Sequence, residues 1–115
     1  MPKFAVLMIV LVALLHLYFL VLEMFLWTRP LGLKTFRNSP EKAQATRVLA
    51  ANQGLYNGFL AAGLLYAAAT GSREFALFFL GCVVVAGVYG AMTVSRRIFV
   101  VQALPALIAL VLLHL

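Results

Sequence analysis

Charged side chains are scarce in this sequence. Its 115 residues include nine basic and three acidic ones, so 10% are charged, whereas about 25% are charged in a typical soluble domain. Hydrophobic residues make up 65% of the chain, against about 45–50% in such a domain. This composition excludes an ordinary cytosolic enzyme of this size. It also excludes intrinsic disorder, because too much apolar surface has to be buried.

Cysteine and the common catalytic motifs are also nearly absent. Cys82 is the single cysteine and cannot pair within the chain, which excludes a disulfide scaffold. The sequence contains no Gly-rich phosphate loop, nucleophile elbow or Cys-x-x-Cys motif. One histidine and one glutamate, His16 and Glu23, lie in the same apolar run. A zinc site needs at least three protein ligands, so we expect no metal and no cofactor.

The basic residues give a net charge of +6 at pH 7. They do not form a tract with interleaved aromatic residues, so we expect no nucleic-acid partner. In so apolar a chain, the distribution of lysine and arginine is better explained as a signal of membrane orientation. The basic residues also suit anionic headgroups, so membrane lipid is an expected partner.

Four stretches are long and apolar enough to be membrane-spanning helices, each of which needs about 20 residues. They cover about residues 4–28, 46–70, 75–94 and 98–115, and leave a basic loop over 29–45. We therefore predict an all-α fold, an integral membrane four-helix antiparallel bundle, as a single transmembrane domain. The glutamate in the first stretch, with no small-residue cleavage pattern after it, argues against a secretory signal.

Local signals mark the ends of these helices. Pro30 cannot continue a helix, so the first span should end near Arg29. Ser39 and Pro40 are typical of a helix start, and we expect the second helix to begin at Pro40, ahead of its span. The 71–72 pair, Gly then Ser, predicts the end of one helix and the start of the next.

Loop charges predict the orientation in the membrane. Seven basic residues fall on one side, namely Arg29, Lys34, Arg37, Lys42, Arg47, Arg96 and Arg97. The opposite side carries only Lys3 and Arg73. Because cytoplasmic loops are enriched in lysine and arginine, we expect the basic loop and the 95–97 turn to be cytoplasmic. Both termini then lie outside the cytoplasm.

Ionisable residues inside a span are costly and are functional candidates by default. In the first span, His16 and Glu23 are seven residues apart and therefore share a helix face, with Trp27 one turn beyond. We expect this face to point into the bundle. Two alternatives stay open: Glu23 as an interfacial residue that reaches the headgroups, and His16 as a structural histidine.

The second span carries an unusual group of polar side chains: Asn52, Gln53, Tyr56 and Asn57. By the rise of about 1.5 Å per residue, Glu23, Asn52 and Gln53 should lie at a similar depth in the cytoplasmic half of the membrane. Tyr89 and Gln102, on the third and fourth spans, should lie at that depth too. We predict a polar layer to which all four helices contribute. The alternative is that the amides only hold the helices together.

Small residues predict close helix contacts. Gly54 and Gly58 form a small-xxx-small step, which lets two helices approach within the bundle or across a homodimer. Pro105 in the fourth span frees one backbone carbonyl beside Gln102 and can kink that helix.

Four segments carry a resemblance to a known family: Leu22–Trp27, Leu49–Leu60, Gly81–Gly90 and Gln102–Pro105. They resemble a family of small bacterial membrane proteins, number thirteen hundred and four in the domain-of-unknown-function series. The resemblance covers essentially the whole chain. It implies a four-helix integral protein of the bacterial inner membrane and says little about activity.

Three functions are compatible with the pattern. The first is a site for a lipophilic small molecule, lined by the polar layer with Trp27 and the tyrosines, in which Glu23 and His16 could isomerise a substrate by proton transfer. The second is a proton-coupled exporter of fixed orientation, because the uneven loop charge argues against a dual-topology exporter. The third is a structural or accessory membrane subunit.

Overall fold

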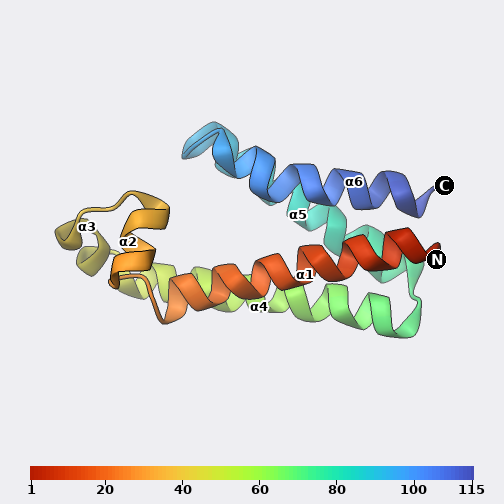
Figure 1. The fold of residues 1–115 in the computed structure, drawn as a ribbon, viewed down its shortest axis with the longest axis horizontal. Helices are drawn as coiled ribbons and strands as arrows, with labels where there is room; N and C mark the ends of the chain where they lie inside the picture. The colour runs from red at the N-terminus through yellow and green to blue at the C-terminus, as the bar shows by residue number, and fades with distance from the viewer. The chain divides into compact units, whose positions relative to one another are not determined.

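The computed structural model describes residues 1–115 and is entirely helical. The long helices are α1 (Lys3–Met24), α4 (Arg47–Thr70) and α5 (Arg73–Thr93). The short ones are α2 (Pro30–Phe36), α3 (Pro40–Ala45), a π-helix η1 (Phe99–Ala103) and α6 (Leu104–Leu113). Figure 1 shows their order along the chain. The predicted all-α class is therefore confirmed.

The chain divides into two compact units. Unit 1 comprises Met1–Leu14 and Leu60–Leu115, and unit 2 comprises Leu15–Phe59. Helices α1 and α4 each contribute residues to both units.

The segment between α1 and α4 is more ordered than the expected basic loop over 29–45. It contains α2 and α3, each of which starts with a proline at its first position. Ser39 caps α3, since its hydroxyl accepts a hydrogen bond from the backbone N–H of Lys42 at 3.2 Å. The predicted helix start at Pro40 is confirmed, but that helix ends at Ala45. Thr46 leaves helical geometry (φ −106°, ψ 9°), and α4 follows as a separate helix.

The first helix is shorter than expected, because α1 ends at Met24 rather than near residue 28. The five residues that follow form a turn, in which Leu26 N–H donates to the Val21 carbonyl instead of continuing the α-helical pattern. Pro30 thus begins α2 after this turn rather than ending α1 directly.

In unit 1, α5 packs antiparallel on η1 and α6. A Cβ atom added to Gly87 would lie 2.6 Å from the backbone nitrogen of Ala103, so only glycine allows this approach. At the other end of α5, the Arg73 guanidinium donates to the Leu113 carbonyl at 2.8 Å. The π-helix directly precedes the first helical turn of α6, which contains Pro105. Proline has no N–H, so Pro105 cannot donate the usual α-helical hydrogen bond to the Val101 carbonyl.

The end of α4 and the start of α5 also pack antiparallel in unit 1. Ser72 caps α5 through a 3.2 Å bond from the Phe75 N–H, and Gly71 adopts the left-handed conformation (φ +68°), as the sequence predicted for this turn. The Phe79 ring fills the space that a side chain at Gly63 would need, and the rings of Tyr66 and Phe75 lie 5.0 Å apart.

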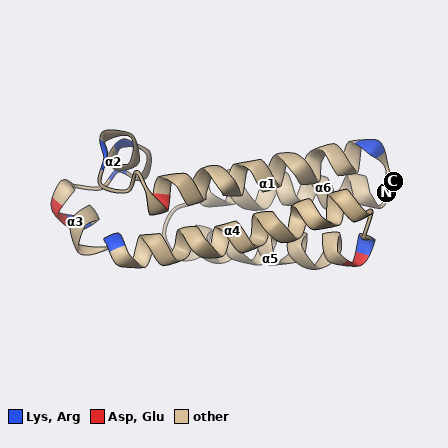
Figure 2. Ribbon diagram, turned by 90° about the horizontal axis from the view of Figure 1, so that it is seen from below, with Lys and Arg blue, Asp and Glu red and all other residues tan.

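Two helices are long and apolar enough to cross a membrane, α1 and α5. In the 18-residue apolar stretch of each helix, only 33% is buried inside the protein for α1 and 22% for α5. The other two expected spans are not long and apolar enough. The side-chain amides at 52, 53 and 57 make α4 less apolar, and the apolar helix over Phe99–Leu113 is shorter. Figure 2 shows charged residues at the ends of the long helices and in α2 and α3, with uncharged stretches between them.

Candidate functional site

A carboxyl–carboxamide contact joins α1 and α4 within unit 2. The Asn57 side-chain nitrogen donates to the Glu23 carboxyl oxygen at 2.5 Å. Both side chains are half-buried. Glu23 comes from the last turn of α1, and Asn57 lies eleven residues into α4. The structure therefore brings together two of the predicted site residues.

Two glycines let the helices come close enough for this contact. A Cβ atom at Gly54 would lie 2.6 Å from Met24 Cγ and 3.2 Å from the Leu20 carbonyl oxygen. One at Gly58 would lie 2.8 Å from Leu20 Cδ1. The small-xxx-small step is thus used against α1 in this chain. The partners run in opposite directions, Gly54 with Met24 and Gly58 with Leu20, so these parts of α1 and α4 are antiparallel, as Figure 1 also shows.

Trp27 ties the turn after α1 to the start of α4. Its indole N–H donates to the Thr46 hydroxyl at 3.1 Å, and its ring lies 4.8 Å from the Phe36 ring of α2. The Thr46 hydroxyl in turn donates to the Lys42 carbonyl at 2.8 Å. Trp27 therefore has partners within the protein, which makes it a positioning residue of this segment.

The helix α2 sits directly against the turn that follows α1. A Cβ atom at Gly32 would lie only 1.9 Å from the Leu26 carbonyl oxygen, so no other residue fits there without a shift of the backbone. This contact and the Trp27–Thr46 bond hold the basic segment in place beside the ends of α1 and α4.

Three other predicted site residues of α4 make no hydrogen bond with α1. Asn52, Gln53 and Tyr56 are exposed. Asn52 donates to the Val48 carbonyl of its own helix at 2.9 Å, and the Gln53 side chain makes no hydrogen bond within the protein. The Tyr56 ring lies 6.2 Å from the Phe59 ring, centroid to centroid, and the Tyr56 hydroxyl makes no hydrogen bond within the protein. The four polar residues of α4 are thus split: Asn57 meets Glu23, and the others lie on the surface.

His16 is fully buried and packs edge-on against Phe19, with ring centroids 5.3 Å apart. No buried side-chain nitrogen or oxygen in the chain lacks a hydrogen-bond partner. His16 and Glu23 are seven residues apart on α1, which corresponds to about 10.5 Å along the axis. This distance is too long for a direct proton transfer between the two side chains. Any proton exchange between them would need a molecule that lies between them.

The two remaining predicted residues belong to unit 1. Tyr89 on α5 is 68% exposed. Gln102 lies in the π-helix and is half-buried. The contribution of these side chains to one polar layer with Glu23 stays a prediction. No group of three or more His, Cys, Asp and Glu residues is placed to hold a metal ion.

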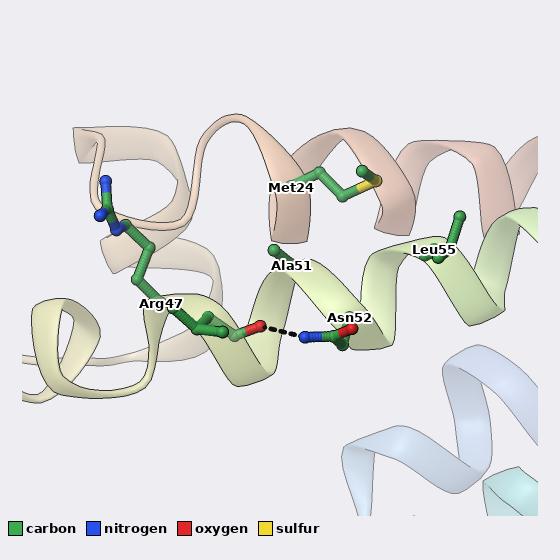
Figure 3. Close-up of a pocket in the computed structure, with 6 residues that line it drawn as sticks. Met24, Arg47, Ala51, Asn52 and Leu55 are labelled. Carbon is green, nitrogen blue, oxygen red and sulfur yellow. Dashed lines mark hydrogen bonds between the residues drawn. The ribbon is translucent and has the colours of Figure 1, made fainter.

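A shallow groove of about 380 Å³ runs along the start of α4 and includes Met24, the residue that follows Glu23 on α1. Its lining residues are Met24, Arg47, Val48, Ala51, Asn52 and Leu55. Figure 3 shows Arg47 at one end, Leu55 at the other and Met24 of α1 above them.

Of the groove residues, only Asn52 was among the predicted site residues. The signal that could have found the others is a helical stripe: positions 47, 51 and 55 are spaced by four, and 48 and 52 lie beside them. Reading inward from the basic segment, this stripe carries a cation at Arg47, the apolar Val48 and Ala51, an amide at Asn52 and the apolar Leu55.

Comparison with known proteins gives a family but no activity. Residues 10–114 match the model of a family described as "Protein of unknown function (DUF1304)". That description states no topology. The resemblance is therefore corrected on this point: the family match gives no support to the four membrane helices that the resemblance implied. The chain is also 29% identical to the "Uncharacterized protein YpaA" of Lactococcus lactis subsp. lactis (strain IL1403), over 96% of this chain and 97% of the relative. No solved structure matches the chain. Because the family model matches most of its length, the chain belongs to the DUF1304 family.

Proposed function

We propose that this chain is an integral protein of the bacterial inner membrane that crosses the bilayer four times. The crossings would be α1, α4, α5 and the continuous helix formed by η1 and α6. The low burial of the apolar windows in α1 and α5 supports this, because a core helix of a soluble protein is mostly buried. Large apolar side chains such as Phe4, Phe78 and Val85 are also 67–73% exposed, as expected for contact with lipid.

The orientation follows from the loop charges. The segment 29–47 and the 95–97 turn together hold seven of the nine basic residues, and both would face the cytoplasm. Cysteine accessibility tests this: a cysteine placed at Lys34 in a Cys82→Ser background should react only after the inner membrane is permeabilised. Reaction in intact cells would overturn the orientation.

Within this membrane protein we propose a binding site for a lipophilic small molecule at the cytoplasmic half of α1 and α4. The observation that carries the proposal is the exposed polar face of α4, Asn52, Gln53 and Tyr56, next to the Glu23–Asn57 contact. A side-chain amide such as Gln53 finds no hydrogen-bond partner in hydrocarbon and none within the protein. A bound molecule with an apolar body and a few polar groups would satisfy these side chains.

Mass spectrometry of the purified protein tests this proposal. The protein is extracted in a mild detergent, and the lipophilic molecules that remain bound are compared between wild type, Gln53→Leu and Tyr56→Phe. We expect a retained molecule in the wild type and less of it in both variants. Tyr66→Phe is the matched control, because it removes a hydroxyl from the same helix but leaves the Phe75 contact in place.

The other outcomes separate the remaining functions. Normal folding of all variants with no molecule retained in any of them would overturn the binding site and favour a structural subunit. Proton-driven uptake into vesicles that is lost in Glu23→Gln would favour an exporter. Isomerisation stays a prediction that applies only if a bound molecule reaches both Glu23 and His16.

A further inference from the structure

The groove at the start of α4 has a chemical gradient along its length. Arg47 lies at its outer end, Asn52 is five residues further in, and Leu55 closes it toward the middle of the helix. At about 1.5 Å per residue, Arg47 and Asn52 are about 7.5 Å apart along the helix axis. Met24, Val48 and Ala51 complete an apolar wall beside them.

We infer that this groove seats one anionic phospholipid from the leaflet that faces the basic segment. The inference rests on the proposed function, because the groove shares Asn52 with the proposed polar face, and it names a phospholipid as the molecule bound there. The phosphate would meet the Arg47 guanidinium, a glycerol ester would lie at Asn52, and an acyl chain would follow Met24 and Leu55. Arg47, Asn52 and Leu55 follow one another in the order of the phosphate, ester and acyl chain of a phospholipid, and the apolar Val48 and Ala51 lie between Arg47 and Asn52.

Charge complementarity favours this occupant. Arg47 is exposed, and its side chain makes no hydrogen bond or ion pair with another residue. Unit 2 contains five basic residues and two acidic ones, and one of the acids, Glu23, is engaged by Asn57. A guanidinium can bind phosphate oxygens through two parallel hydrogen bonds, which a diffuse surface attraction does not provide.

The middle of the groove also has free hydrogen-bonding capacity. The Asn52 side-chain nitrogen uses one N–H on the Val48 carbonyl, which leaves its second N–H and its oxygen available. The second N–H can donate to an ester carbonyl. The volume of about 380 Å³ lies in the range of small-molecule sites, and the groove is shallow and open to its surroundings. It would therefore hold the glycerol region and the first part of one chain, while the rest of the lipid stays in the bilayer.

Native mass spectrometry of the full chain tests this inference. The protein is loaded with either phosphatidylglycerol or phosphatidylcholine, and the number of retained lipids is compared for wild type, Arg47→Gln and Lys34→Gln. Lys34 is exposed on α2 and does not line the groove, so it is a matched control for charge. A basic residue near a membrane surface contributes about 1 kcal/mol of diffuse attraction, or about fivefold in binding.

We expect the wild type to retain one phosphatidylglycerol and to lose phosphatidylcholine. Arg47→Gln should weaken phosphatidylglycerol retention about tenfold or more, and Lys34→Gln by no more than about fivefold. Equal losses in both variants would overturn the inference, because diffuse attraction alone would then explain the binding. Equal retention of both lipids by the wild type would overturn it too.

Two further measurements keep the test independent of the folding of Arg47→Gln. Ala51→Trp fills the groove without a change in charge and should abolish retention, whereas Ala51→Ser should not. A photoreactive phosphatidylglycerol should label wild-type protein at Met24 or within 47–55, and labelling elsewhere would contradict the inference. If a neutral lipophilic molecule co-purifies and phosphatidylglycerol does not, the inference fails but the proposed function stands. If nothing is retained, both fail.

Discussion

Replacing Asn57 by leucine should destabilise the packing of α1 against α4. The substitution roughly preserves side-chain size and removes the N–H group that donates to the Glu23 carboxyl at 2.5 Å. The carboxyl then stays half-buried beside an apolar side chain. Asn52→Leu is the matched control, since it makes the same change on the same helix, where the side chain is exposed and bonded only to its own helix.

The expected size of the effect follows from this environment. Hydrogen bonds that involve a charged group contribute about 1.5–3 kcal/mol in soluble proteins, whereas polar contacts between membrane helices average about 0.6 and reach about 1.7 kcal/mol. For one half-buried bond we expect Asn57→Leu to lower the free energy of unfolding by about 1 kcal/mol, or about fivefold in the unfolding equilibrium. Glu23→Gln should cost less, because the glutamine keeps an oxygen acceptor.

Reversible unfolding in mixed micelles measures these differences, and a double-mutant cycle isolates the contact. Glu23→Leu and Asn57→Leu are made singly and together, and the coupling energy between them should be about 1 kcal/mol. If the two effects add with no coupling, or if Asn52→Leu costs as much as Asn57→Leu, the Glu23–Asn57 bond does not stabilise the helix pair and the reasoning is refuted.

Three other substitutions test the surrounding structure. Gly32→Ala should expose the 25–36 segment to protease, because its Cβ atom would lie 1.9 Å from the Leu26 carbonyl oxygen; unchanged cleavage would contradict this packing. Thr46→Val should lower the free energy of unfolding by about 1 kcal/mol and shift the fluorescence of the single tryptophan, Trp27, because its N–H loses its acceptor; an unshifted spectrum would mean that this bond is not formed. Arg73→Gln should speed hydrogen exchange in the last turn of α6, whose Leu113 carbonyl it no longer caps, and should leave exchange in α4 unchanged.

The parts of the fold that depend on local chemistry were predictable from the sequence. A serine followed by a proline or a polar residue gives a helix cap wherever the backbone allows it, and both Ser39 and Ser72 form such caps. The end of α1 was not predictable in this way. It falls six residues before Pro30, because the turn after α1 is fixed by tertiary contacts, notably that of Gly32 with Leu26.

The candidate site was predictable only in part. Helical periodicity placed Glu23 and Asn57 on helices, and they meet because Gly54 and Gly58 remove the bulk between them. The same periodicity cannot say which amides turn inward. Asn52 bonds the carbonyl four residues before it, a local alternative to an interhelical partner that any helical asparagine can adopt. The prediction grouped all four polar residues of α4, whereas the structure brings only Asn57 to Glu23 and leaves the other three exposed.

The side-chain amides of α4 make the helix too polar to be recognised as a membrane span. The same amides make it the best candidate for a binding site. Its amides lower the apolar character of the stretch and cluster within the six residues 52–57, and no charged or amide side chain follows them in the helix. A helix that served only to span the bilayer would gain stability if leucine replaced an exposed amide such as Gln53, because hydrocarbon offers that amide no partner. If the chain crosses the membrane at α4, the exposed amides must therefore be covered by a polar group from another molecule. Sequences depart from local rules of this kind mainly where binding compensates the cost.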